Sequence, residues 1–334
     1  MKIVLVTPLL NLGGGQRYVT ELANYWSSNG HNVHIIVLRT GKSYYSINNE
    51  VDVIELSLLD KGKIKKVISS FKTFYNLRKK IKQIKPDFVL SILSSTNILV
   101  ILATRNLGVK VFVVDVMSPL RSRSVLEKGC RKLLYKKASG IIALTDMAND
   151  MIKKETGHNN IRTIHNPISK IKKYQREKEK IVINVGRLNY AKGQKYFLEA
   201  CAKIRDPDWK FVILGEGELR NNLEKQIDEL DIHKYIVLEG AVKNVSEWLA
   251  RASIFAFPSV TESFPIALLE GMAAGLPCVS FDCVTGPNEM IEDGENGFLV
   301  PLGDVELFTM RIKQLMRNEK LRILFSNNAQ LINQ

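Results

Sequence analysis

The stretch IFAFPSVTESFPIALLEGMAAGLPCVSF, residues 254–281, contains the unit from which the fold is built. Its two ends, 254–259 and 277–281, are apolar runs of strand length, and the segment between them is long enough for a helix. Strands that are apolar on both sides are typical of parallel sheets, which helices cover on both faces. From Ser263 to Phe281 the only charged side chain is Glu270. Burying an unpaired carboxylate is costly, so Glu270 must bind a partner or a ligand.

The same alternation of apolar runs and helix-length segments continues through most of the chain. Strands are expected in the first half at KIVLVTP, NVHIIVL, FVLSIL, VKVFVVDV and GIIAL, and in the second half at KIVINVG, KFVILG, YIVLEG, IFAFPS, PCVSF and GFLVP. This pattern predicts an α/β protein with two doubly wound, Rossmann-like domains. We place them at residues 1–168 and 169–334, joined by the polar segment 166–180. Ligands of such sheets bind beyond the carboxyl ends of the strands, which here predicts a site in the cleft between the domains.

Length and composition agree with two soluble domains. The 334 residues exceed one comfortable hydrophobic core. The four cysteines form no C-x-x-C pair, and reduced thiols in a cytosol are the simplest interpretation. No run of about 18 apolar residues exists that could span a membrane. We therefore expect a cytoplasmic protein.

Charge is distributed unevenly between the halves. Residues 1–170 hold 27 Lys and Arg against 11 Asp and Glu, a net of +16, whereas residues 171–334 hold 21 against 23, a net of −2. The first half is therefore expected to face an anionic partner.

The segment 261–277 combines groups that suit a phosphorylated sugar. Pro265 is typical of the first position of a helix, and the helix after it, apolar on every side, is expected to be buried. The amides at its start, near Phe264, Pro265 and Ile266, form an anion site. Glu262 and Glu270 flank that site and can accept hydrogen bonds from hydroxyl groups. From the residues alone, Glu270 could equally pair with a buried Arg or Lys.

Three glycine-containing turns follow predicted strands. In NVGRLNYAKG (184–193), Arg187 and Lys192 could neutralise a diphosphate without a metal, or could belong to a solvated loop. In FVILGEGEL (211–219), Gly215 and Gly217 form a turn that is a weak signal by itself. In LLNLGGGQRYV (9–19), Gly14 and Gly15 allow a close approach of the backbone to an anion. That turn lacks both the third glycine of a dinucleotide-binding motif and the Lys-Ser/Thr of a P-loop, which disfavours dehydrogenases and P-loop NTPases.

These motifs, in this order, resemble glycosyltransferase family 4, the retaining enzymes of GT-B fold also called glycosyl transferases group 1, in the type that builds bacterial surface glycans. Glu262 and Glu270 have the spacing of the family's Glu-x7-Glu motif. GRLNYAKG, LGEGELRNNLE, TGPNEMIEDGENGFLVP and GGGQR also resemble family motifs. The resemblance is strong over 181–301, moderate over 1–22 and 131–168, and weak over 23–130.

The resemblance implies an activity and a separate role for each domain. The second domain would bind a nucleotide-diphosphate sugar, with uridine the common base. Arg187 and Lys192 would hold the diphosphate, Glu270 the ribose hydroxyls and Glu262 the donor sugar. The amides near Phe264–Ile266 would cap the phosphate or sugar, and Gly14 and Gly15 would face the phosphate from the first, acceptor-binding domain. Transfer would retain the anomeric configuration and need neither cofactor nor metal. The D-x-D in DPD (206–208) is interpreted as a loop.

One position departs from the family pattern. Members often have a His, or a Glu-Arg-Asn run, at the end of the strand that here reads VFVVDVMSP. Asp115 is the nearest candidate for an acceptor-side base or orienting carboxylate. The alternative is a strand-end aspartate that caps a turn.

The basic segments of the first half suggest where the acceptor is found. Residues 61–85 carry ten Lys and Arg and no acid, and residues 121–137 carry seven and one. Basic amphipathic helices suit an anionic membrane surface, so we expect a lipid-linked glycan acceptor used at the inner face of the plasma membrane. Alternatively, the apolar stripe docks on the sheet and the basic side is merely solvated. No recognised module supports nucleic acid. A soluble-acceptor synthase, a nucleotide-sugar epimerase and a non-catalytic polyanion- or membrane-binding module remain alternatives.

Overall fold

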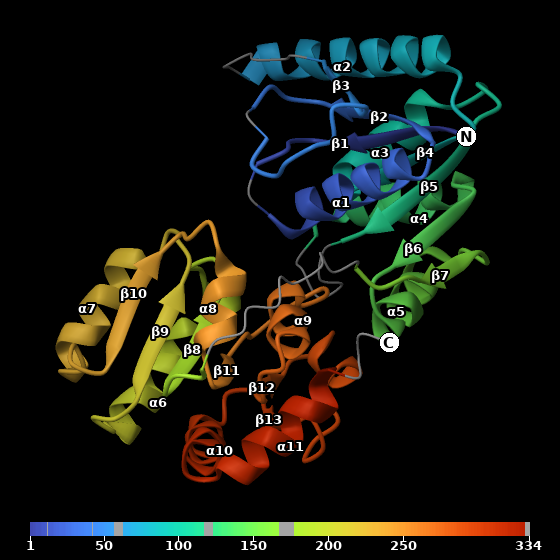
Figure 1. The fold of residues 1–334 in the computed structure, drawn as a ribbon. Helices are drawn as coiled ribbons and strands as arrows, with labels where there is room; N and C mark the ends of the chain where they lie inside the picture. The colour runs from blue at the N-terminus through green and yellow to red at the C-terminus, as the bar shows by residue number, and fades with distance from the viewer. Residues whose placement is uncertain (12, 42, 57–62, 117–122, 167–176, 331–334) are drawn as a thin grey trace. The chain divides into compact units, whose positions relative to one another are not determined.

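The computed structural model describes residues 1–11, 13–41, 43–56, 63–116, 123–166 and 177–330. The chain divides into two compact units, Met1–Pro167 and Ile168–Gln334, each with its own sheet (Figure 1). Most of the predicted linker lies outside the described residues.

Unit 1 contains a seven-stranded sheet in the order β3-β2-β1-β4-β5-β6-β7, with every neighbouring pair parallel. The strands are β1 (Lys2–Thr7), β2 (Asn32–Val37), β3 (Asp52–Glu55), β4 (Phe88–Ile92), β5 (Lys110–Asp115), β6 (Gly140–Ala143) and β7 (Ile161–Thr163). The helices are α1 (Gly14–Ser28), α2 (Lys63–Ile84), α3 (Ser94–Ala103), α4 (Val125–Leu134), the short 3₁₀ helix η1 (Tyr135–Lys137) and α5 (Asp146–Thr156). After the edge strand β3 the chain crosses back through α2 to β4, which pairs with the other side of β1, so unit 1 is doubly wound.

Unit 2 has a six-stranded parallel sheet in the order β10-β9-β8-β11-β12-β13. The strands are β8 (Ile181–Val185), β9 (Lys210–Leu214), β10 (Ile236–Gly240), β11 (Ile254–Phe257), β12 (Cys278–Asp282) and β13 (Gly297–Pro301). The helices are η2 (Tyr190–Lys192), α6 (Gln194–Ile204), α7 (Arg220–Leu230), α8 (Val245–Arg251), α9 (Ile266–Ala273), η3 (Pro287–Glu289), α10 (Val305–Arg317) and α11 (Glu319–Gln330). The predicted α/β class with two doubly wound sheets is confirmed.

Apolar strand residues and the facing stripes of the helices form the core of each unit. In unit 1, Val4 and Val113 of the sheet pack with Leu77 of α2 and Val100 of α3. In unit 2 the core is more aromatic: Phe211 of β9 packs with Phe197 of α6, and Phe281 of β12 packs with Phe308 of α10. Burial of these side chains holds the strands in the register that brings their carboxyl ends to one edge.

Helix α9 corrects the expectation for the helix within segment 261–277. The helix spans eight residues, and Pro265 is its N-cap rather than its first residue. Leu268, Leu269 and Met272 are buried, whereas Ile266 and Glu270 are only half-buried. The prediction that the helix is buried on every side was wrong, because so short a helix packs on the sheet along one face only.

The two basic segments differ in how their apolar residues are used. In α2, Leu77 and Ile81 are buried on the sheet, which fits the alternative of a core-facing helix with a solvated basic side. In α4 the exposed apolar residues are Val125, Leu126 and Leu133. No helix in the described part of the chain is long and apolar enough to cross a membrane.

Candidate active site

The site residues predicted in unit 2 lie after the carboxyl ends of β8, β9 and β11, in the loops or, for Ile266 and Glu270, in helix α9. From β8 the sheet continues in one direction to β9 and β10, and in the other to β11, β12 and β13. The boundary between β8 and β11 is thus the point where the winding reverses. Loops diverge at such a point, which makes it the usual ligand site of an open parallel sheet.

Two opposite charges meet at this point. The Lys192 ammonium donates a hydrogen bond to Glu262, with 2.6 Å between Nζ and Oε1. The Glu262 side chain is 8% exposed and that of Lys192 is 23% exposed. The pair resolves the cost of burying Glu262, because a carboxylate out of water needs a close counter-charge.

The backbone fixes Lys192 in this position. Asn189 caps η2 by accepting a hydrogen bond from the Lys192 amide at 3.2 Å. Gly193 follows in the left-handed region at φ 62°, and a Cβ there would lie 2.0 Å from the Pro258 carbonyl oxygen. Val260 donates its amide to the Ala191 carbonyl at 2.8 Å. The loop after β8 is thus held against the loop after β11, which brings the two charged side chains together.

The loop after β12 fixes Glu262 from the other side. The Thr285 hydroxyl donates a hydrogen bond to the Glu262 carbonyl oxygen. Gly286, at φ 105°, lies so close to Pro265 that an added Cβ would be 2.3 Å from the proline Cδ. Cys283 is buried nearby, and burial together with the charge of Glu262 raises the pKa of its thiol to about 12. Cys283 therefore stays neutral at ordinary pH and is a packing group.

Gly215 and Gly217 allow two loops to approach closely. A Cβ at Gly215 would lie 1.9 Å from the Gly186 carbonyl oxygen, and one at Gly217 would lie 2.2 Å from that of Leu188. The structure therefore gives these glycines a backbone role beside the β8 loop. The Arg187 side chain in that loop is 69% exposed and forms an ion pair with Glu218 at 3.4 Å. It is thus more solvated than Lys192.

The start of α9 completes the group in unit 2. Phe264 and Pro265 are buried, and the half-buried Ile266 and Glu270 lie on one side of the helix, since residues four apart share a face. Glu262 lies four residues before the helix, so Glu262, the amides and Glu270 belong to one continuous segment, and Lys192 reaches Glu262 from the β8 loop. A lysine, two carboxylates and the start of a helix thus lie after the carboxyl ends of β8 and β11.

In unit 1, Gly15 brings the start of α1 against the carboxyl ends of two strands. Helix α1 begins at Gly14, and a Cβ on Gly15 would lie 3.3 Å from Val116 Cγ2 and 3.4 Å from Ile92 Cδ1. The start of α1 therefore lies at the same sheet edge as Asp115.

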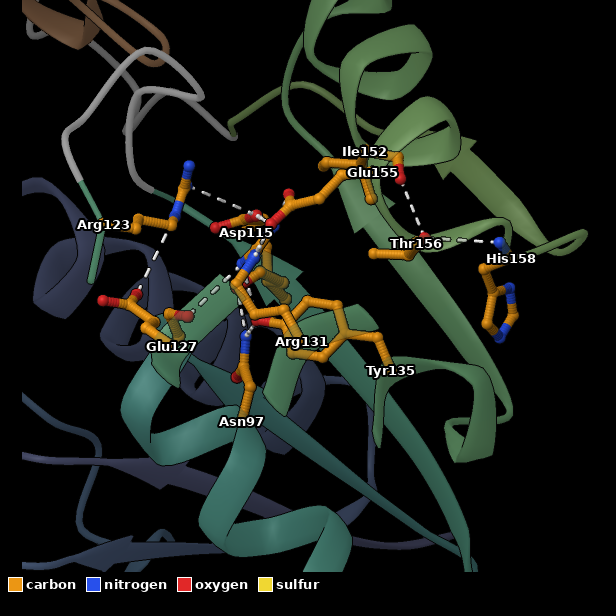
Figure 2. A network of polar contacts seen from close by, with 12 residues as sticks. Asn97, Asp115, Arg123, Glu127, Arg131, Tyr135, Ile152, Glu155, Thr156 and His158 are labelled. Carbon is orange, nitrogen blue, oxygen red and sulfur yellow. Dashed lines mark hydrogen bonds and ion pairs between the residues drawn. The ribbon is translucent and has the colours of Figure 1, made fainter. Parts of the chain in front are cut away.

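Asp115 ends β5 inside a buried polar network (Figure 2). Arg131 of α4, which is fully buried, donates from one guanidinium nitrogen to Asp115 Oδ2 at 2.6 Å and to Glu155 of α5 at 2.8 Å. Its other terminal nitrogen donates to the Tyr135 hydroxyl at 2.9 Å. Asn97 of α3 also donates to that hydroxyl, at 3.1 Å. The network therefore connects α3, β5, α4 and α5.

The electrostatics of this network follow mainly from Arg131, which bonds two carboxylates, while a second cation, Arg123, lies 4.0 Å from Asp115. Burial lowers the pKa of Arg131, but the hydrogen bond to Glu155 and the charge of Asp115 outweigh it and raise the pKa overall. Burial, with the charge of Asp115, raises the pKa of Tyr135 to about 12. Asp115 is thus bonded to Arg131. From the sequence, a turn-capping aspartate was the alternative to a role at the acceptor. Its second oxygen, Oδ1, is buried and has no hydrogen-bond partner within the described ranges.

Sequence reasoning missed Arg131, Glu155 and Thr285. Arg131 lies in the basic segment 121–137, which was interpreted as a solvated or membrane-facing surface. Glu155 lies on another helix, 24 residues away in the sequence, so no local pattern pairs it with Arg131. Within segment 121–137 the sequence offers one acid, Glu127, as a possible partner for a basic residue, and in the structure it lies beside Arg123.

Metal binding requires a cluster of ligands. Within the described residues there is no group of three or more His, Cys, Asp or Glu side chains placed to hold a metal ion.

The sequence matches two family profiles, described as Glycosyltransferase Family 4 over residues 12–170 and Glycosyl transferases group 1 over residues 167–331. Between them they extend over nearly the whole chain. The chain belongs to glycosyltransferase family 4.

Similar proteins agree with this membership. The glycosyltransferase is 29% identical, over 98% of its length and 92% of the relative, to GalNAc-α-(1→4)-GalNAc-α-(1→3)-diNAcBac-PP-undecaprenol α-1,4-N-acetyl-D-galactosaminyltransferase of Campylobacter jejuni. It is 32% identical to UDP-Gal:α-D-GlcNAc-diphosphoundecaprenol α-1,3-galactosyltransferase of Escherichia coli, over 43% of this chain and 38% of that one. The solved structure of Anabaena HepE in complex with UDP superposes with a TM-score of 0.82 at 16% identity, covering 99% of this chain and 94% of that chain. The fold is GT-B.

Proposed function

We propose that this glycosyltransferase moves a sugar from a UDP-sugar to a lipid-linked glycan, with retention of configuration, during assembly of a bacterial surface polysaccharide. The observation that carries the proposal is the Lys192–Glu262 pair beside the start of α9, at the point where the sheet of unit 2 reverses its winding. A nucleotide-diphosphate sugar has a group for each element of this site.

Each residue has a role that follows from its chemistry. Lys192, with Arg187, would neutralise the diphosphate, and the amides at Phe264–Ile266 would bind an anionic oxygen. Glu270 would accept hydrogen bonds from the ribose hydroxyls and Glu262 from the donor sugar. Gly215 and Gly217 would keep the β8 loop close to the sheet edge.

The chemistry of transfer would rest on charge stabilisation. As the bond between the sugar and the diphosphate breaks, negative charge grows on the leaving phosphate, and a fixed ammonium at Lys192 stabilises it. The acceptor attacks from the face that the diphosphate leaves, and the leaving phosphate can take the acceptor proton. Such a site needs positioning and fixed charge, so we propose that it needs no metal.

Unit 1 would contribute one group for the donor and one for the acceptor. Gly14 and Gly15, at the start of α1, would offer backbone amides to the donor phosphate. Asp115 Oδ1, at the carboxyl end of β5, would accept a hydrogen bond from the acceptor hydroxyl and orient it.

The names of the relatives support the choice of substrates. The Escherichia coli relative is named for a UDP-Gal donor, and both relatives are named for acceptors carried on a diphosphate-linked undecaprenol. The net charge of +16 in residues 1–170 suits such acceptors, which sit among anionic headgroups. We therefore place the enzyme at the inner face of the plasma membrane.

The test is a transfer assay with purified protein. UDP-linked glucose, galactose, GlcNAc and GalNAc are each offered with a polyprenyl-diphosphate disaccharide, with and without EDTA. The proposal expects one donor to give a product with a retained anomeric centre and the same rate in EDTA. An inverted product would disprove retention, and loss of activity in EDTA would disprove metal independence. Preference for a sugar phosphate over the lipid-linked glycan would support the soluble-acceptor alternative.

A further inference from the structure

Helix α4 is oriented with its apolar side toward solvent. Val125 is 89% exposed, Leu126 77% and Leu133 70%, whereas Arg131 on the opposite side is fully buried. A helix that packs on a sheet normally buries its apolar stripe and exposes its charges. The reversal in α4 therefore calls for a physical cause and for a partner that covers the apolar side.

The buried network is the cause (Figure 2). Arg131 donates two hydrogen bonds to Glu155 at 2.8 and 2.9 Å and one to Asp115 at 2.6 Å. Turning it outward would take these bonds from both carboxylates, and Arg123, 4.0 Å from Asp115, is too far away to replace them. Tyr135, one turn further on, is also fully buried. Residues 131 and 135 thus fix which side of the helix faces inward, and 126 and 133, two turns apart, are held outward.

Positive charge surrounds the exposed apolar side chains. Lys128 and Lys132 of α4 are exposed, and so are Lys136 and Lys137 of the following η1. The one acid of the helix, Glu127, is only 22% exposed, and its carboxylate lies 3.8 Å from Arg123. The solvent side therefore presents apolar side chains among lysines.

This combination identifies the partner. A surface with an apolar layer beneath negative headgroups complements apolar residues flanked by lysines. A second copy of the chain would bring its own lysines against these in a two-fold contact, which like charges oppose. Helix α2 also has exposed aromatic residues, Phe71 and Tyr75. Its apolar stripe, however, with Leu77 and Ile81, is buried in the core, so α2 does not have the reversed orientation of α4.

We propose that the outward side of α4, formed by Val125, Leu126 and Leu133 with the flanking lysines, docks on an anionic lipid surface. The apolar side chains enter the boundary between headgroups and acyl chains, and the lysines lie at the level of the phosphates. This deepens the membrane contact of the proposed function by assigning it to one helix, but docking itself does not depend on sugar transfer.

Vesicle sedimentation of the whole chain tests the proposal. The vesicles are phosphatidylcholine with about one-third phosphatidylglycerol, or phosphatidylcholine alone. Wild type should bind the anionic vesicles, and Leu126→Ser with Leu133→Ser should weaken binding about tenfold or more, because the buried apolar area drives insertion. The matched control is Ile323→Ser with Leu324→Ser, since these are exposed apolar neighbours on α11 of unit 2. The control should bind within about twofold of wild type.

Three outcomes would overturn the proposal: unchanged binding by the α4 variant, equal binding to neutral vesicles, or equal losses in the α4 and α11 variants. A wild-type dimer that the α4 variant converts to a monomer would assign the surface to self-association. UDP binding, measured in parallel, should be the same in wild type and the α4 variant. Failure of UDP binding in wild type with vesicle binding intact would refute the proposed donor and leave the docking surface standing.

Discussion

At the scale of single residues, Glu262 shows how burial and charge are reconciled at the edge of a sheet. Its carboxylate is nine-tenths buried and contacts Lys192 at 2.6 Å, while its own carbonyl is held by Thr285. A buried ion pair contributes little net stability, but it makes each partner sensitive to removal of the other. The pair is therefore better explained as a device for placing two charges than as a source of stability.

Glu262→Gln should lower kcat/KM by about 10²–10³, because a neutral amide of the same size cannot pair with Lys192 or accept as strongly from sugar hydroxyls. Steady-state transfer kinetics measure this. Glu224→Gln, which removes an exposed carboxylate bonded to Arg220, should leave kcat/KM within a factor of about two. Equal effects of the two substitutions would contradict the role of Glu262.

Gly193→Ala should lower the unfolding free energy by more than about 1–2 kcal/mol and weaken UDP binding. The left-handed conformation alone accounts for that amount, and the clash with the Pro258 carbonyl adds to it. Gly294→Ala is the matched control, since Gly294 has φ +81° and an added Cβ meets no described atom within 4 Å. Urea unfolding and UDP titration of both variants check this. A Gly193 variant no worse than the Gly294 variant would show that the close approach of the two loops is not required.

At the scale of elements, the network around Arg131 sets the orientation of α4. One guanidinium connects a strand end and two neighbouring helices, and it does so from a site with no exposure. Because a buried cation cannot exchange its partners for water, the network permits one orientation of the helix about its axis.

Arg131→Met should cost about 3–5 kcal/mol of unfolding free energy, because Asp115 and Glu155 then lose the buried cation that is hydrogen-bonded to both. Arg251→Met provides the comparison: Arg251 forms the same two-bond contact with Glu179, at 2.6 and 3.0 Å, but at the surface. That substitution should cost about 0.2–1 kcal/mol. Chemical denaturation measures both. A cost for Arg131→Met as small as that for Arg251→Met would show that the network does not hold α4.

The sequence predicts the long buried strands well, because an apolar run needs burial on both faces wherever it occurs. It does not predict β3 (DVIE) or β7 (IRT), which are short edge strands with charged residues and depend on a neighbour for their hydrogen bonds. The spacing of the motifs identified Glu262, Glu270 and Lys192 as candidate site residues. Local periodicity carries no sign of the contact between Lys192 and Glu262, which are 70 residues apart, or of the Arg131–Glu155 pair, which are 24 apart.

At the scale of the whole molecule, the chain has two cores and two kinds of surface. Units Met1–Pro167 and Ile168–Gln334 each contain a complete parallel sheet, and the positive charge belongs to the first half. Domains with separate cores can unfold separately. Under the proposals above, most donor-binding residues lie in the second unit and the membrane-docking surface lies in the first.

Calorimetry should therefore show two transitions. Arg131→Met should lower the transition of unit 1 and Gly193→Ala that of unit 2, each leaving the other within about 1 °C. The assignment follows from where each residue lies. A single transition lowered by either substitution would mean that the two units unfold as one cooperative body.

The measurement that most directly tests the central claim is titration calorimetry of UDP, in metal-free buffer, into wild type, Lys192→Ala and Lys195→Ala. Lys195 is an exposed lysine three residues further along, so its removal changes the charge of unit 2 equally. The account predicts that wild type and Lys195→Ala bind UDP alike and that Lys192→Ala loses about tenfold or more in affinity. Equal affinities in all three proteins would contradict the placement of the donor site at the Lys192–Glu262 pair.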